Sequence, residues 1–240
     1  ESAMEACEYP DTDIYGVRTL EDVLKIVCEK DDCSDMLVKH RARTMDGRGR
    51  RSERAGIMDF SEIIGQSAAK RGLEIAAAGG HNVLLIGPPG AGKSSLAKAM
   101  SLILPPMTRK ESIETSKIYS VAGKNTDGGL IKLRPFRAPH HTSSLTAFLG
   151  GGSDNIMPGE ISLAHNGILF MDEFCETPKH ITEALRAPLE DRKVIISRLR
   201  SKVEYPASFM LIAATNPCPC GYFGDGDKCT CAPNRRIAYL

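Results

Sequence analysis

The chain has 240 residues, 42% of them hydrophobic, which is enough for one complete α/β core with sequence left over for a tail or part of a second domain. Its formal net charge of +1 excludes a global attraction to nucleic acid or membranes, so any nucleic-acid binding must come from local basic patches. No apolar run reaches the roughly 18–20 residues of a membrane span, and the N-terminus lacks a signal-peptide pattern, so we expect a cytoplasmic protein that does not interact with membranes.

Two short regions are expected to precede the main domain. Residues 1–38 contain one predicted helix, Leu20 to Cys28, whose apolar residues recur at helical spacing but are too few to form a core. We therefore expect residues 1–38 to be the end of a larger domain. Residues 39–58 are expected to form a basic linker, because residues 39–54 hold seven Lys and Arg residues against two acidic ones.

Residues 59–240 show the alternation of helices and apolar strands that is typical of an α/β domain with a parallel sheet. A helix is predicted from Ser67 to Ala78, where Gly79 and Gly80 end it. Three continuous apolar runs are of the kind that is buried on both faces of a sheet, and they are Asn82 to Ile86, Gly167 to Met171 and Phe209 to Ala214.

Two further elements are predicted between the second and third strands. Thr177 is expected to cap a helix in which Pro178 takes the first position and which runs to about Glu190. Lys193 to Val203 has apolar residues on both sides of a polar centre, so we expect a β-hairpin whose tip carries Arg198 and Arg200.

A phosphate-binding loop follows the first strand directly. Residues 87–94 read GPPGAGKS and fit the pattern G-x-x-x-x-G-K-[ST], and the helix Ser94 to Leu104 begins where the loop ends. In such a loop the backbone N–H groups surround phosphates, Lys93 reaches the β- and γ-phosphates, and the Ser94 hydroxyl binds Mg²⁺. A chance glycine turn is the alternative, and the flanking strand and helix argue against it. The predicted nucleotide-binding residues are Gly87, Pro88, Pro89, Gly90, Ala91, Gly92, Lys93, Ser94 and Ser95.

Polar residues end the other two strands. Asp172 and Glu173 follow an apolar strand, and carboxyl ends of parallel strands are where such sheets bind ligands. Asp172 is therefore predicted to hold Mg²⁺ and Glu173 to activate the water that attacks the γ-phosphate. Asn216 ends the third strand and is predicted to orient that water. Without the phosphate-binding loop, a solvated acidic strand end and an ordinary turn would explain these residues.

Five separated motifs together resemble the magnesium-chelatase-like AAA+ family, in particular its YifB/ComM group. They are residues 59–66, the phosphate-binding loop, residues 136–141, residues 158–167 and residues 216–221, and they span the chain from residue 59 to its end. The resemblance implies a P-loop NTPase fold of the AAA+ type, a three-layer sandwich around a parallel sheet. It further implies a hexameric ring with ATP between subunits, in which Ile63, Ile64 and Gly65 line the adenine pocket.

The resemblance also implies that this chain is truncated. Family members continue with an arginine finger and a helical lid, which we expect to lie beyond residue 240, and Arg235 and Arg236 do not match that finger. Residues 1–38 are then expected to be the last part of the family's N-terminal domain. The hairpin from Arg192 to Glu204 and the stretch from Phe136 to Gly152 correspond to family insertions that face the pore of the ring.

Four of the eight cysteines cluster near the C-terminus. Cys218, Cys220, Cys229 and Cys231 supply enough thiolates for a tetrahedral zinc site, although C-x-C spacing is less common in zinc motifs than C-x₂-C. Four reduced thiols that brace a loop are the open alternative. His140 and His141 suggest a metal as well, but adjacent side chains point apart and no carboxylate partner is evident, so a structural or pore-loop role is preferred.

These features favour an ATP-driven motor that acts on DNA, for which Arg198, Arg200 and the basic linker are the support. The alternative is a chelatase-type or protein-remodelling subunit that uses the same ATP cycle on a protein partner. A nucleotide switch without turnover fits less well, because Glu173 and Asn216 are both in place.

Overall fold

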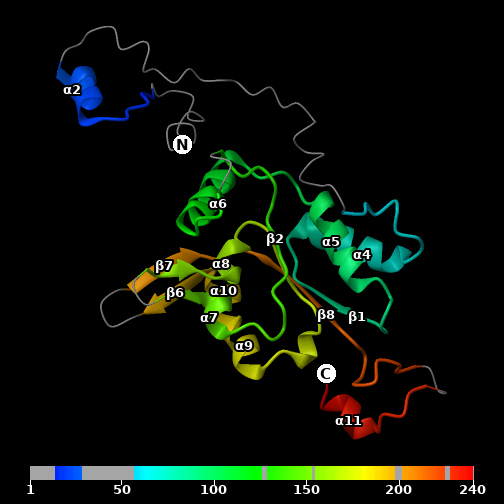
Figure 1. The fold of residues 1–240 in the computed structure, drawn as a ribbon. Coiled ribbons are helices and arrows are strands. Elements are labelled where there is room, and N and C mark those ends of the chain that lie inside the picture. The colour runs from blue at the N-terminus through cyan, green and yellow to red at the C-terminus, as the bar shows by residue number, and fades with distance from the viewer. Residues whose placement is uncertain are drawn as a thin grey trace.

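The computed structural model describes residues 14–28, 57–125, 129–152, 155–197, 202–224 and 228–239. Its centre is a four-stranded sheet in the order β1-β8-β5-β2, with all neighbouring strands parallel. These strands are β1 (Val83–Ile86), β8 (Met210–Thr215), β5 (Ile168–Met171) and β2 (Phe136–Arg137). The parallel α/β architecture predicted for residues 59–240 is confirmed, and it brings the carboxyl ends of β1, β8 and β5 together at one edge (Figure 1).

The remaining elements are helices and two small antiparallel strand pairs, and α2 lies apart from the sheet in Figure 1. The helices are α2 (Leu20–Cys28), α4 (Ser67–Gly79), α5 (Lys93–Ile103), α6 (Arg109–Val121), α7 (Leu145–Leu149), α8 (Glu160–Leu163), α9 (Lys179–Ala184), α10 (Arg186–Asp191), α11 (Pro233–Ile237) and the 3₁₀ helix η2 (Phe174–Glu176). The strand pairs are β3 (Gly150–Gly151) with β4 (Met157–Pro158) and β6 (Lys193–Ser197) with β7 (Lys202–Pro206).

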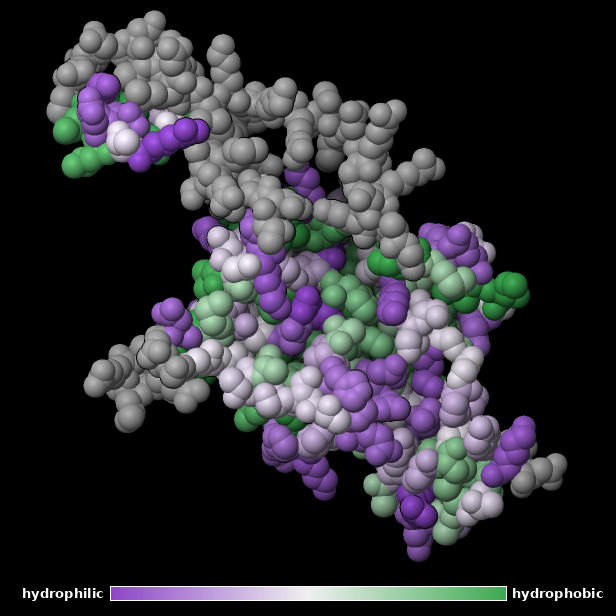
Figure 2. Space-filling view, in the orientation of Figure 1, coloured by the Kyte–Doolittle hydropathy of each residue, from purple (hydrophilic) through white to green (hydrophobic). Residues whose placement is uncertain are grey.

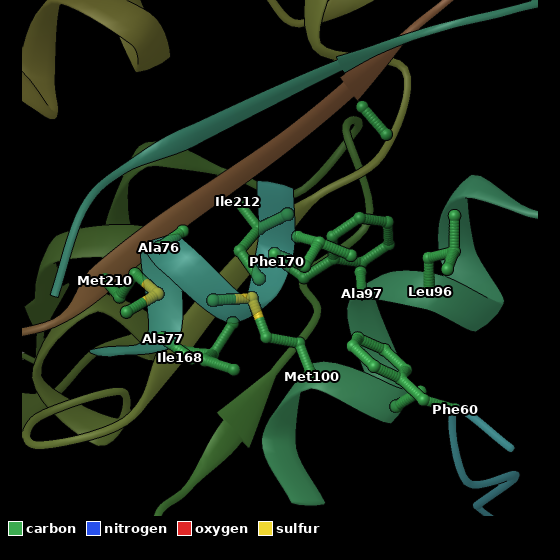
Figure 3. Close-up of a cluster of buried hydrophobic side chains, with 13 residues drawn as sticks. Phe60, Ala76, Ala77, Leu96, Ala97, Met100, Ile168, Phe170, Met210 and Ile212 are labelled. Atoms are coloured by element: carbon green, nitrogen blue, oxygen red, sulfur yellow. The ribbon is translucent and has the colours of Figure 1, made fainter. Parts of the chain in front are cut away.

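Strand β5 separates two hydrophobic clusters because its side chains alternate between the sheet faces. Ile168 and Phe170 pack with residues of α4 and α5, among them Met100, in the cluster drawn in Figure 3. Leu169 and Met171 pack on the opposite face against α7, α8, α9 and the β6–β7 hairpin. All four β5 residues are buried, as the continuous apolar run predicts. The sheet is therefore the middle of three layers.

Several predicted elements are confirmed by the structure. Helix α2 has the predicted bounds, and α4 ends at a Gly80 C-cap in the left-handed conformation. The hairpin is also present, with Ser197 opposite Lys202. Its predicted tip, with Arg198 and Arg200, and residues 39–56 of the predicted linker lie outside the described residues.

The helix predicted from Thr177 to Glu190 is wrong in two respects. Pro178 stands at the N-cap, and Thr177 Oγ1 is buried without a hydrogen-bond partner among the described residues, so it caps nothing. The helix also divides at Leu185 into α9 and α10. Pro188 explains the division, because it has no N–H to donate to the carbonyl of Ala184 and its ring would clash there.

Two strand predictions also need correction. Strand β1 was expected to be buried on both faces, but it is the edge strand, and Leu84 and Ile86 are 53% and 52% exposed. Phe136 and Arg137 were assigned to an insertion, yet they form β2 at the other edge of the sheet. Phe136 stacks on Phe170 of β5 with ring centroids 5.9 Å apart, which holds this two-residue strand in place.

The surface in Figure 2 mixes hydrophilic and apolar residues, with apolar residues in separate patches. In the part of the chain that the structure describes, no helix combines the length and the apolar character needed to cross a membrane.

Candidate nucleotide site

The phosphate-binding loop lies between β1 and α5. Gly90 and Gly92 have positive φ angles of 76° and 80°, which residues with a Cβ rarely adopt, so these glycines allow the loop to turn sharply into the helix. A cavity of about 410 Å³ opens beside the loop, a size that suits a small ligand. Its lining consists of Pro89, Gly90, Ala91, Gly92, Lys93, Ser94, Ser95, Asp172, Glu173, Thr215 and Asn216.

The ammonium group of Lys93 donates hydrogen bonds to three oxygen atoms. They are the carbonyl oxygens of Gly87 at 2.7 Å and Pro88 at 3.1 Å, and Asn216 Oδ1 at 3.1 Å. Burial lowers the pKa of Lys93, whereas the negative charge of Asp172 acts in the opposite direction. The loop thus places a cation within hydrogen-bond reach of Asn216, at the end of the neighbouring strand.

Ser94 and Asp172 meet across the cavity. Ser94 Oγ donates a hydrogen bond of 2.7 Å to Asp172 Oδ2, although 78 residues separate the two along the chain. Mg²⁺ prefers oxygen ligands at about 2.0–2.1 Å in octahedral geometry, in which adjacent ligands lie about 3 Å apart. A hydroxyl and a carboxylate at this spacing fit adjacent positions around Mg²⁺. The residues present therefore suit the metal that sequence analysis assigned to them.

Glu173 has an unusual backbone conformation, with φ at 50° and ψ at 44°. Non-glycine residues in this left-handed region are uncommon and concentrate at functional sites. The N–H of Glu173 donates to Asp172 Oδ1 at 2.9 Å, so Asp172 uses one carboxylate oxygen for Ser94 and the other for this turn. Both carboxylates line the cavity, where Asp172 contacts Ser94 and Glu173 contacts His141.

His141 contacts Glu173, which corrects the expectation that the histidine pair has no carboxylate partner. His141 Nδ1 lies 2.9 Å from Glu173 Oε2. The two histidine rings also lie together, with centroids 4.2 Å apart, instead of pointing apart. His140 Nδ1 accepts the N–H of Thr142 at 3.3 Å, which fixes that ring beside its neighbour. The contact between His141 and Glu173 was not predictable from the sequence, because 32 residues separate the two.

The end of β8 completes the cavity with Thr215 and Asn216. The carbonyl of Thr215 accepts the N–H of Gly87 at 3.2 Å, so the first residue of the loop is tied to this strand. Thr215 was not predicted as a site residue, although its place beside Asn216 at a strand end was a usable signal. Gly87 and Pro88 contribute carbonyl acceptors for Lys93, but they are absent from the cavity lining.

The predicted adenine-contacting residues lie outside the cavity. Ile63 packs partly against the core, and Ile64 is 96% exposed. The neighbouring Gln66 makes the contact with the loop, since its side-chain amide donates to the carbonyl of Ala91 at 3.2 Å. Residues 63–65 therefore lie near the loop along the chain, and their role with adenine stays a prediction.

The remaining candidates lie beyond the cavity. The sulfur atoms of Cys218, Cys220, Cys229 and Cys231 all lie within 4.8 Å of one another, on the loop that follows Asn216. Arg235 and Arg236 belong to α11, where the Arg236 guanidinium lies over the ring of Phe223 at 4.4 Å.

The chain is similar to known proteins over the whole α/β domain. The sequence profile described as magnesium chelatase, subunit ChlI, matches residues 59–240. YifB of Salmonella typhimurium is 51% identical over 182 residues, which cover 76% of this chain and 36% of the relative. Competence protein ComM of Haemophilus influenzae is 42% identical over an alignment that covers 100% of this chain and 46% of the relative. The chain thus spans less than half the length of these relatives.

A solved structure shares the fold. It is a chain from a cryo-EM-based structure of the complex between subunits BchI and BchD of magnesium chelatase, with 22% sequence identity and a TM-score of 0.53. The match covers 75% of this chain and 59% of that chain.

Proposed function

We propose that the cavity binds ATP with Mg²⁺ and that Glu173 helps a water molecule to cleave the bond between the β- and γ-phosphates. The chain belongs to the magnesium chelatase ChlI family of AAA+ ATPases. The observation that carries the proposal is the 2.7 Å contact between Ser94 and Asp172 beside Lys93. Three distant segments of the chain thereby bring to one cavity the cation Lys93 and the ligand Ser94, the carboxylates Asp172 and Glu173, and the amide Asn216.

Each side chain has a distinct role in the proposed reaction. Lys93 binds the β- and γ-phosphates, while Ser94 and Asp172 hold Mg²⁺, which when bound offsets the charge on the phosphate oxygens. Glu173 accepts a proton from the attacking water, and the Asn216 amide orients that water without adding charge. Lys93 must exchange its three present acceptors for phosphate oxygens, which is favourable because charged acceptors form stronger hydrogen bonds.

The binding step is tested by replacing the lysine. Lys93→Ala should weaken the affinity for Mg-ATP by about 10- to 100-fold or more, since even one charge-assisted hydrogen bond is worth about 1.5–3 kcal/mol. Isothermal titration calorimetry on this chain measures the effect. Lys98→Ala is the matched control, because Lys98 is an exposed lysine of the same helix outside the cavity lining. Equal affinities of wild type and Lys93→Ala would refute the assignment of the loop.

We further propose that the protein works as a ring-forming motor on DNA. Support comes from the relative named competence protein ComM and from the basic residues Arg198 and Arg200 in the predicted hairpin tip. The alternative is action on a protein partner, which the relative named magnesium-chelatase 38 kDa subunit and the BchI–BchD complex favour. Stimulation of ATP turnover by single-stranded or branched DNA, measured on the protein at its natural length, supports the first proposal. Turnover that DNA leaves unchanged contradicts it.

A further inference from the structure

The four clustered thiols lie at the distances that a tetrahedral metal site requires. Cys218 Sγ is 3.3 Å from Cys220 Sγ and 3.9 Å from Cys229 Sγ, and the sulfur atoms of Cys220 and Cys229 are 3.7 Å apart. Zinc with Zn–S bonds of about 2.3 Å keeps its four sulfur ligands about 3.8 Å from one another. The sulfur atoms of Cys218, Cys220 and Cys229 therefore already approximate one face of a ZnS₄ tetrahedron, and Cys231 Sγ lies within 4.8 Å of each of them.

Burial argues against four reduced thiols that merely pack together. Cys218 is fully buried, but Cys220, Cys229 and Cys231 remain partly exposed, so their packing would stabilise the loop little. Four thiolates in tetrahedral geometry are typical of structural zinc.

The thiol cluster lies directly behind the nucleotide cavity. Cys218 follows Asn216 by two residues, and Gly221 follows Cys220. A Cβ added to Gly221 would lie 2.8 Å from two ring carbons of Pro89 and 3.9 Å from Asn216 Cγ, so this loop packs closely against the phosphate-binding loop. A ligand that restricts the motion of the four thiols would therefore also restrict the backbone at Asn216.

We propose that Cys218, Cys220, Cys229 and Cys231 bind one structural zinc ion that holds the loop after β8 in place against Pro89 and Asn216. Four protein ligands leave no open coordination position, so the ion takes no part in chemistry. Thiols that are still protonated release their protons on binding, so the affinity for zinc rises with pH.

Metal analysis of this chain, purified without chelator, tests the proposal. The wild type should carry about one zinc ion per chain, and Cys229→Ser should lose most of it. Cys175→Ser is the control, because Cys175 is a free cysteine outside the cluster. Cobalt substitution is a second measurement on the intact wild type, which avoids a misfolded variant. Absorption bands of tetrahedral thiolate-bound Co²⁺, displaced by added Zn²⁺, would support the site, whereas wild type that binds neither metal would overturn it.

A separate experiment tests whether the zinc site supports the nucleotide cavity. Removing zinc with a chelator should lower the thermal unfolding temperature and weaken Mg-ATP affinity, because Asn216 and Pro89 lose their support. A chain that binds zinc but no nucleotide would contradict the proposed function and leave the metal site standing. Zinc removal that changes neither the unfolding temperature nor the affinity would refute the supporting role.

Discussion

Glu173 is the residue whose replacement separates binding from chemistry most cleanly. Glu173→Gln keeps the shape of the side chain but cannot accept a proton from water, while Lys93, Ser94 and Asp172 remain to hold Mg-ATP. Turnover of the natural-length protein should fall by about 10²-fold or more, with nucleotide affinity nearly unchanged. Glu176→Gln is a control at the end of η2, the short helix that follows Glu173, and Glu176 lies outside the cavity lining. Near-normal turnover would mean that another group activates the water.

His141 is expected to position Glu173. The Glu173 side chain is 52% exposed, and the contact with His141 Nδ1 restricts where its carboxylate can lie. His141→Ala should therefore lower turnover by about 10-fold, because misplacement of a base by about 1 Å already costs that much or more. Affinity for Mg-ATP should stay unchanged, and His141→Asn, which retains an N–H donor, should recover part of the rate. A faster enzyme would show instead that the contact holds Glu173 away from the water.

The role of a site residue was predictable where that residue belonged to a recognisable sequence pattern. Asp172 and Asn216 were found because parallel strands share an edge, so two strand ends predict one location. His141 gave no such signal, since it follows the two-residue strand β2 in an irregular loop. Its partner could be identified only once the fold had brought residues 141 and 173 together.

At the scale of elements, His165 joins the segment before β5 to the turn before β8. The ring is 4% exposed, its Nδ1 accepts the N–H of Ser208 at 3.0 Å, and Nε2 lies 3.5 Å from Glu114 Oε2. The distance to Glu114 is too long for a good hydrogen bond, so the buried ring gains little compensation for a positive charge. Burial lowers the pKa of His165 below its ordinary value of 6.5, and Glu114 opposes this only in part.

A pH dependence of stability follows from that shift. Above about pH 6.5 the His165 imidazole is neutral in both the folded and the unfolded state. Below that pH the unfolded chain takes up a proton that the folded chain resists, so the free energy of unfolding decreases as the pH decreases. His165→Asn offers Oδ1 to the Ser208 N–H and should lose less stability between about pH 7.5 and about pH 5.5. Urea unfolding at both pH values measures this, with His180→Asn as a control at an exposed position. Equal pH dependence in wild type and His165→Asn would contradict the assignment.

The elements themselves were predictable where one local signal dominated. Gly79 and Gly80 at the end of α4 and the alternating hairpin strands gave bounds close to those observed. Predictions failed where tertiary context decided the outcome. Whether the apolar run of β1 is central or at an edge depends on strand order, which the run does not encode. Strand β2 pairs with β5, and Phe136 stacks on Phe170; no local pattern indicates either contact.

For the whole molecule, the β6–β7 hairpin is the element most suited to reach a macromolecular partner. Val194 and Ile196 are buried in the second hydrophobic cluster, and the Tyr205 hydroxyl donates to the carbonyl of Ile156 at 2.6 Å, so the base of the hairpin is firmly attached. Five residue pairs then lead from Lys193 opposite Pro206 to Ser197 opposite Lys202. The four residues between these strands include Arg198 and Arg200.

If the substrate is DNA, the two arginines are expected to contact phosphates. The double substitution Arg198→Ala with Arg200→Ala should weaken DNA binding for all sequences alike, because phosphate contacts carry no base information. It should also reduce the slope of log affinity against log salt by about 2, one unit for each lost contact. Fluorescence anisotropy on the natural-length protein at several salt concentrations measures both effects. Lys193→Ala is the control, since it removes a cation at the base of the same hairpin, where Lys193 pairs with Glu204. Unchanged salt dependence in the double variant, with DNA still bound, would assign the contact to another surface and leave the hairpin for a protein partner.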